Sequence, residues 1–176
     1  MADRMDSEKL IKIAVTGLWI FLLMLVQTAA SEFLMIKNVA PDLLFAFSLA
    51  FACREEKLMN VLITALVCGV AADFLCHSSF AGCSGIYTYS ALLMFFLKNL
   101  FIKPNIVFLS VIALLLFLAG KSLTYGVICL YGVQSITRCF ENYIIPVSFY
   151  NTVCFAVMAL IFRLSAARRE KRNEQI

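Results

Sequence analysis

The chain has 176 residues, 62% of them hydrophobic and only 15% charged, with a net charge of +4 and a mean hydropathy of +0.91. A soluble globular chain is nearer half apolar, with about a quarter of its residues charged, so the composition excludes that class. It indicates an integral membrane protein of several spans, whose surroundings are the lipid bilayer, and we expect no nucleic-acid partner.

Six apolar segments follow one another along the chain. Continuous apolar runs favour helices, because the strands of a membrane barrel would alternate in polarity. The first run is close to span length rather than the shorter core of a cleavable signal, so we interpret it as a retained helix. We therefore predict an all-α integral membrane protein with six transmembrane helices in one bundle, a single polytopic domain over 1–176. The predicted spans are roughly 10–30, 39–53, 58–76, 85–102, 105–133 and 143–163.

Proline positions agree with these boundaries. Each of the three prolines falls at or near the start of a proposed span, where the N–H that proline lacks would have no partner within the helix. They are Pro41, Pro104 and Pro146.

Lys and Arg positions set the orientation. With six spans and both termini in the cytoplasm, the outer side holds only Lys37 and Arg138, and Lys121 lies inside a span. Residues 164–176 form a basic cytoplasmic tail. The inner side then holds Arg4, Lys9, Lys12, Arg54, Lys57, Lys98, Lys103, Arg163, Arg168, Arg169, Lys171 and Arg172.

The second span is the shortest. Its uninterrupted apolar part is only about 13 residues, short enough for a re-entrant segment. If it did not cross, one basic terminus would face outward, so the charge distribution favours crossing. Arg54 and Lys57 would then extend their charged ends to the inner surface.

Three ionisable residues fall within or at the rim of the apolar zone: Asp42, Asp73 and Lys121. A charge at the bilayer centre costs ~2.5–3.5 kcal/mol on insertion scales, so such residues usually face the bundle interior and find partners. The proposed topology puts all three in the outer half of the bilayer, and we expect one shared polar cluster between spans two, three and five.

A purely structural or solvent-facing interpretation is also open for each of these three residues. Asp42 follows Pro41, and a carboxylate in the first turn of a helix is favoured by the helix dipole alone. Asp73 could meet water at the outer interface, and the long stem of Lys121 could carry its charge there too.

Small residues follow helical spacing on two spans. Ala65, Gly69 and Asp73 are spaced i, i+4, i+8, and Ala46 and Ala50 form a similar pair on span two. Small residues at this spacing let another helix approach closely. We expect these faces to receive a partner helix, with Asp42 and Asp73 fixing its register.

Residues that would carry catalysis or bind a metal are sparse. There is one histidine, and the spacing of the cysteines around it is not that of a zinc site. Two of the cysteines near the outer face could pair as a disulfide, but nothing fixes which of Cys76, Cys83 and Cys139 do so. Two intramembrane aspartates invite comparison with an aspartyl protease, but no motif of the known intramembrane types is present. We expect no cofactor, no metal and no enzymatic activity.

Between Ala40 and Phe101 the chain carries Pro-Asp-Leu-Leu, a short charged turn and Gly-x-x-x-Asp in this order, and the segment resembles the bacterial rod-shape-determining protein MreD family. Pro41 to Leu44 match its Pro-Asp-Leu-Leu start to span two, and Arg54 to Lys57 match its short charged turn. Gly69 and Asp73 match Gly-x-x-x-Asp in span three. A glycine loop from Gly82 to Gly85 and an aromatic span four with Tyr87 and Tyr89 follow. The match covers about residues 39–102, its motifs are short, and the many cysteines and phenylalanines depart from it.

The resemblance implies a non-enzymatic protein of the bacterial cytoplasmic (inner) membrane. Such proteins work in the cell-elongation complex with the single-span protein MreC, the filament MreB and the polymerase and transpeptidase pair that build peptidoglycan. The family's bundle is also similar to the substrate-binding S component of energy-coupling-factor vitamin transporters. A transporter component of that type is the alternative function.

Overall fold

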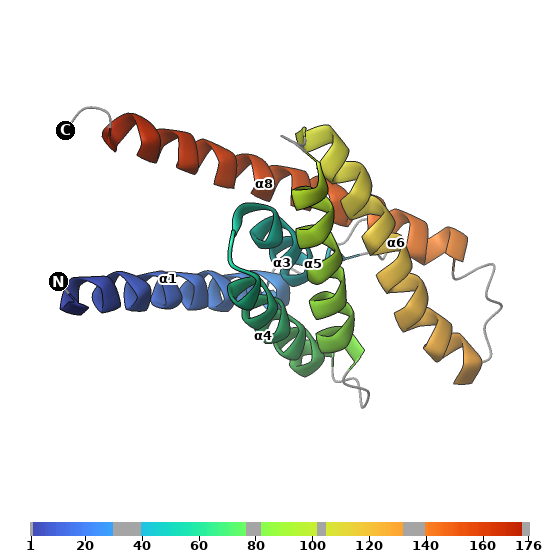
Figure 1. The fold of residues 1–176 in the computed structure, drawn as a ribbon. Coiled ribbons are helices and arrows are strands. Elements are labelled where there is room, and N and C mark those ends of the chain that lie inside the picture. Colours follow the sequence, from blue (N-terminus) through green and yellow to red (C-terminus); the bar gives the residue numbers. More distant parts are fainter. Residues whose placement is uncertain (1, 30–39, 77–81, 102–104, 132–139, 174–176) are drawn as a thin grey trace.

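A computed structural model describes residues 2–29, 40–76, 82–101, 105–131 and 140–173 (Figure 1). Side chains are described over 14–29, 40–75, 82–101, 105–125 and 140–165. Within these residues every regular element is a helix, which confirms the all-α prediction. The elements are α1 (Ala2–Ala29), α3 (Leu43–Arg54), α4 (Leu58–Cys76), α5 (Gly82–Leu100), α6 (Ile106–Tyr131), the π-helical turn η1 (Phe140–Ile144) and α8 (Ile145–Asn173).

Three of the described helices are long and apolar enough to cross a membrane. Their apolar stretches are Leu58–Leu75 in α4, Ile106–Tyr125 in α6 and Phe140–Ser165 in η1 and α8. The apolar parts of α1 and α3, Ala14–Ala29 and Leu43–Arg54, are shorter. At ~1.5 Å per residue, the 12 residues of α3 rise about 18 Å, well below the ~30 Å of a hydrocarbon core.

Large apolar side chains cover the outside of these helices. In a soluble protein such a surface would aggregate, whereas in a bilayer it meets acyl chains, so the surface is compatible with a membrane protein. Exposed apolar residues lie one or two turns apart along α4 and α8: Met59, Ile63, Leu66, Val70 and Phe74, then Phe149, Val153, Val157, Leu160 and Leu164.

Helix α3 lies inside the bundle. Every residue from Pro41 to Ala50 is buried, so the first eight residues of α3 have no face left for lipid, whereas Phe51, Cys53 and Arg54 near its end are partly or fully exposed. Residues near the start of α5 contact the start of α3, and Lys98 near the end of α5 contacts the end of α3. The two helices therefore run in the same direction. The second predicted span is thus an interior helix that is shorter than the hydrocarbon core of a membrane.

Helices α4 and α5 form an antiparallel pair in close backbone contact. A Cβ atom at Gly69 would lie 2.3 Å from Ser84 Cα and 2.9 Å from Ser84 N. Only glycine permits this approach, and it brings the end of α4 against the beginning of α5.

Both chain ends point to the same side of the bundle. The start of α1 and the end of α8 both lie on the left in Figure 1. Pro146 is the second residue of α8 and follows the π-helical turn η1 directly, so it lies at the junction of the two rather than in the first turn of a free-standing helix. The helix α8 continues to Asn173, ten residues beyond the predicted span, through the segment expected to be a basic tail. Pro104 lies outside the described residues.

Candidate functional site

Asp42 caps the N-terminus of α3. Its carboxylate Oδ1 accepts from the backbone N–H of Phe45 at 3.2 Å, and its carbonyl oxygen accepts the first helical bond, from Ala46 N at 3.1 Å. A carboxylate in this position satisfies N–H groups that have no partner in the helix, and its charge faces the positive end of the dipole. Because α3 begins inside the protein, the capping carboxylate is buried too, with only 8% of the residue exposed.

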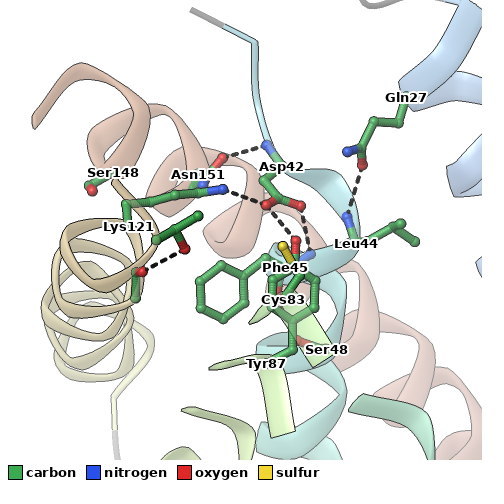
Figure 2. Close-up of polar contacts among 12 residues, drawn as sticks. Gln27, Asp42, Leu44, Phe45, Ser48, Cys83, Tyr87, Lys121, Ser148 and Asn151 are labelled. Carbon is green, nitrogen blue, oxygen red and sulfur yellow. Dashed lines mark hydrogen bonds and ion pairs between the residues drawn. The ribbon is translucent and has the colours of Figure 1, made fainter. Parts of the chain in front are cut away.

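Three other helices bring polar side chains to Asp42 (Figure 2). The ammonium of Lys121 on α6 lies 2.6 Å from Oδ2, and the hydroxyl of Tyr87 on α5 donates to the same oxygen at 2.5 Å. The backbone N–H of Asp42 donates to Oδ1 of Asn151 on α8 at 2.7 Å. We call Asp42, Tyr87, Lys121 and Asn151 the Asp42 cluster. It ties α3, α5, α6 and α8 together at one point.

Aromatic packing beside the Asp42 cluster fixes where α6 lies. The ring of Phe45 stacks on Tyr87, with centroids 4.4 Å apart and planes 6° apart, and meets Phe117 of α6 edge to face at 4.8 Å. A Cβ at Gly120 would approach Ile86 Cγ2 to 2.9 Å and Phe45 Cε1 to 3.1 Å. Glycine at 120 therefore lets α6 come close to α3 and α5, and the next residue, Lys121, can reach Asp42.

The first helix also reaches the start of α3. Gln27 on α1 accepts from the backbone N–H of Leu44 at 3.3 Å through Oε1 (Figure 2). Two backbone N–H groups at the start of α3, those of Asp42 and Leu44, thus donate to the amide side chains of Asn151 and Gln27. Sequence reasoning missed both, although each is an amide inside an apolar run, a pattern that indicates hydrogen bonding between membrane helices.

Asp73 has different partners. It lies near the end of α4, and its carboxylate accepts from the first free N–H groups of α5, Cys83 N at 3.0 Å and Ser84 N at 3.1 Å. We call Gly69, Asp73, Cys83 and Ser84 the Asp73 junction. Asp73 thus acts as a capping residue supplied by the preceding helix rather than as a third member of the Asp42 cluster.

The single shared cluster predicted from the sequence is therefore only part of the arrangement. Asp42 and Lys121 come together, whereas the hydrogen bonds of Asp73 go to backbone groups across the α4–α5 turn. Tyr87 lies one turn beyond Ser84 on α5. The first turns of α5 therefore contact both aspartates.

The small-residue faces are occupied within the chain itself. Ala46, Ala50 and Ala65 are buried, and Gly69 packs against the backbone of α5. The sequence interpretation expected these faces to receive a helix from another protein. In the structure they allow the protein's own helices to approach, because Leu43–Ala50 of α3 are buried by neighbouring helices.

Lys98 satisfies the other end of α3. Its ammonium donates to the carbonyl oxygen of Ala52 at 3.0 Å and to that of Glu55. Carbonyl groups at a helix C-terminus carry partial negative charge and have no partner in the helix. Nearby, Arg54 stacks over the ring of Phe162 on α8, 5.3 Å from its centroid. Lys98 was predicted only as an inner-side charge.

The geometry limits what the two aspartates can do chemically. A protease dyad needs two carboxylates that share a proton. Here Asp42 is neutralised by Lys121, and Asp73 is held by two backbone N–H groups. Within the described part of the chain no three His, Cys, Asp or Glu side chains gather as metal ligands would. Cys76 and Cys139, two of the three cysteines considered for a disulfide, have side chains outside the described residues.

Comparison of the chain with known protein families, with curated proteins and with solved structures finds no match.

Proposed function

We propose that this protein is a membrane-embedded scaffold of the bacterial cell-elongation complex, of the MreD type, with six crossings and both termini in the cytoplasm of an inner membrane. The supporting observation is the role of the residues that carry the resemblance. Asp42 anchors the Asp42 cluster, and Gly69 and Asp73 form the Asp73 junction. The short motifs thus coincide with the contacts that determine how α3, α4 and α5 pack.

The position of the chain ends agrees with this topology. The beginning of α1 and the end of α8 lie on one side of the bundle, as an even number of crossings requires (Figure 1). The interior helix α3 runs parallel to α5 and antiparallel to α4, so it preserves the alternation of direction although it is short.

A partner such as MreC would dock on outer surfaces. Because the small-residue faces of α3 and α4 are filled from within, a single-span partner helix has the exposed apolar sides of the outer helices available. Association there would depend on close packing between helices rather than on a carboxylate, since both carboxylates already have internal partners.

The alternative, an S component of a vitamin-type transporter, requires several polar groups that converge on a ligand. Polar groups do converge at Asp42, but they bind one another: the carboxylate accepts from Lys121, Tyr87 and the N–H of Phe45. The acceptor positions of the Asp42 carboxylate are thus taken up within the protein, which favours a structural junction over a site for a transported vitamin.

Co-purification tests the proposal. The tagged chain, expressed with MreC and solubilised in a mild detergent, is expected to retain MreC, and to restore rod shape in cells depleted of their own MreD. Lys121→Met, which breaks the Asp42 cluster, should fail in both assays, whereas Gly17→Ala, at a site with open space around it, should behave as the unmodified chain. Folded protein that neither retains MreC nor restores shape would refute the scaffold. A tightly bound vitamin with an ATPase partner would favour the alternative.

A further inference from the structure

Only one of the two polar atoms of the Asn151 side chain has a hydrogen-bond partner among the described residues. The residue is fully buried, and its Oδ1 accepts from the backbone N–H of Asp42 at 2.7 Å. This contact fixes the orientation of the amide, because exchanging its oxygen and nitrogen would place two donors face to face. The amide nitrogen Nδ2 then has no hydrogen-bond partner among the described residues. Buried amide N–H groups are rarely left unpaired, since the loss of their hydration is not recovered.

Lys121 contributes a second donor on the same side of Asp42. Figure 2 shows Lys121 and Asn151 reaching Asp42 from the same direction, one from α6 and one from α8. An ammonium carries three N–H groups, and the one directed at Asp42 leaves others oriented away from the carboxylate. The region beside the carboxylate is therefore rich in donors.

Charge and size restrict what these donors can bind. The ammonium of Lys121 is already balanced by Asp42 at 2.6 Å, so an added anion would be a second, uncompensated negative charge in a medium of low dielectric constant. A neutral oxygen acceptor has no such cost. Asn151 is enclosed by its helix neighbours Val147, Ser148 and Phe155, all buried, so the acceptor must be small.

We propose that Asn151 Nδ2 binds a small uncharged oxygen acceptor, on the side from which Lys121 also reaches Asp42. The shared chemistry is a single neutral oxygen, supplied by a water molecule or by the carbonyl of a small organic molecule carried over from the cell. This site goes beyond the scaffold function and does not depend on MreC.

A structure of the full chain in lipid nanodiscs at about 2 Å, in buffer without added ligand, tests the site. The expected result is a separate density peak about 3 Å from Asn151 Nδ2, a hydrogen-bonding distance. Native mass spectrometry of the same preparation separates the two sources, because an organic molecule adds mass and water does not. Absence of a peak, or an oxygen of the protein itself in that place, would overturn the proposal.

Two variants show whether the amide holds the acceptor. Asn151→Leu should abolish the peak, whereas Thr152→Val, the next residue on α8, should keep it, because the Thr152 hydroxyl donates to Ser148 O within its own helix. A peak that persists in Asn151→Leu would contradict the assignment. If Asn151→Leu does not fold, the unmodified chain still tests the proposal, because a density peak beside Nδ2 supports it and the absence of a peak refutes it.

Discussion

Two aspartates lie within apolar helices of this protein, and they are stabilised by different means. Asp42 is buried and has a full countercharge in Lys121, a phenol in Tyr87 and one backbone N–H. Asp73 is partly buried and, among the described residues, accepts from two backbone N–H groups at the beginning of α5. Backbone N–H groups at a helix N-terminus thus suffice to stabilise the partly buried carboxylate of Asp73. The buried carboxylate of Asp42, which lies where four helices meet, is stabilised by an ion pair as well.

The largest difference between the two sites is expected from removing the countercharge of Asp42. Lys121→Met leaves a buried carboxylate unpaired and should lower the free energy of unfolding by about 3–5 kcal/mol. Unfolding in mixed detergent and SDS micelles measures this loss. The double variant Asp42→Asn with Lys121→Met removes both charges and should recover a large part of the stability. A loss below about 1 kcal/mol in the single variant would contradict a buried ion pair.

At the Asp73 junction the largest effect should come from backbone proximity rather than from charge. Gly69→Ala places a Cβ 2.3 Å from Ser84 Cα, so α4 and α5 must move apart, at a cost of about 1–3 kcal/mol or more. Gly17→Ala is the matched control, because nothing lies within 4 Å of its Cβ. It should be neutral or slightly stabilising, since alanine forms helix better than glycine. Equal unfolding midpoints for the two variants would argue against close α4–α5 packing.

Removing the Asp73 carboxylate should lower the free energy of unfolding by less than Gly69→Ala does. Asp73→Ala loses two acceptor contacts at the start of α5, and loss of a capping side chain costs about 0.5–2 kcal/mol. Asp73→Asn should cost less still, because its amide oxygen can accept one of the two N–H groups. If Asp73→Ala were as damaging as Lys121→Met in the same unfolding assay, the distinction between the two aspartates would fail.

Lys98 can be compared with Lys121, because its described hydrogen bonds go to backbone carbonyl groups and not to a carboxylate. Lys98→Met removes donors to Ala52 O and Glu55 O at a partly exposed helix end, where water can replace them. We expect a loss of about 1 kcal/mol or less, close to that of Asp73→Ala. The same assay checks this, and a loss as large as that of Lys121→Met would contradict the small effect expected at a partly exposed helix end.

Part of this arrangement could be predicted from the sequence. Apolar runs gave helices at the right places, and α4 spans the same residues, 58–76, as the third predicted span. The proximity of Asp42 and Lys121 followed from the high cost of isolated charges in hydrocarbon. The partners of Asp73 did not follow, because they are backbone groups whose availability depends on where α5 begins.

The inward faces of the helices could not be predicted by the same reasoning. In a soluble protein, polarity separates the core side of a helix from the outer side. Here both sides are apolar, so Ala46 and Ala50 of the enclosed α3 look in sequence like residues available to a partner. Asn151 was missed for a related reason, since one amide in a long apolar run does not specify which helix it meets.

The order in which the chain is synthesised gives α3 a further property. Its capping residue Asp42 precedes Lys121 by 79 residues and Asn151 by 109, and Lys98 follows Glu55 by 43. When α3 leaves the ribosome, the side chains that neutralise its ends have yet to be translated. A helix of 12 residues is too short to span a bilayer. With a carboxylate at one end and carbonyl groups without partners at the other, it would be unstable in lipid by itself. The polar contacts at both ends of α3 are therefore complete only once α5, α6 and α8 have been synthesised.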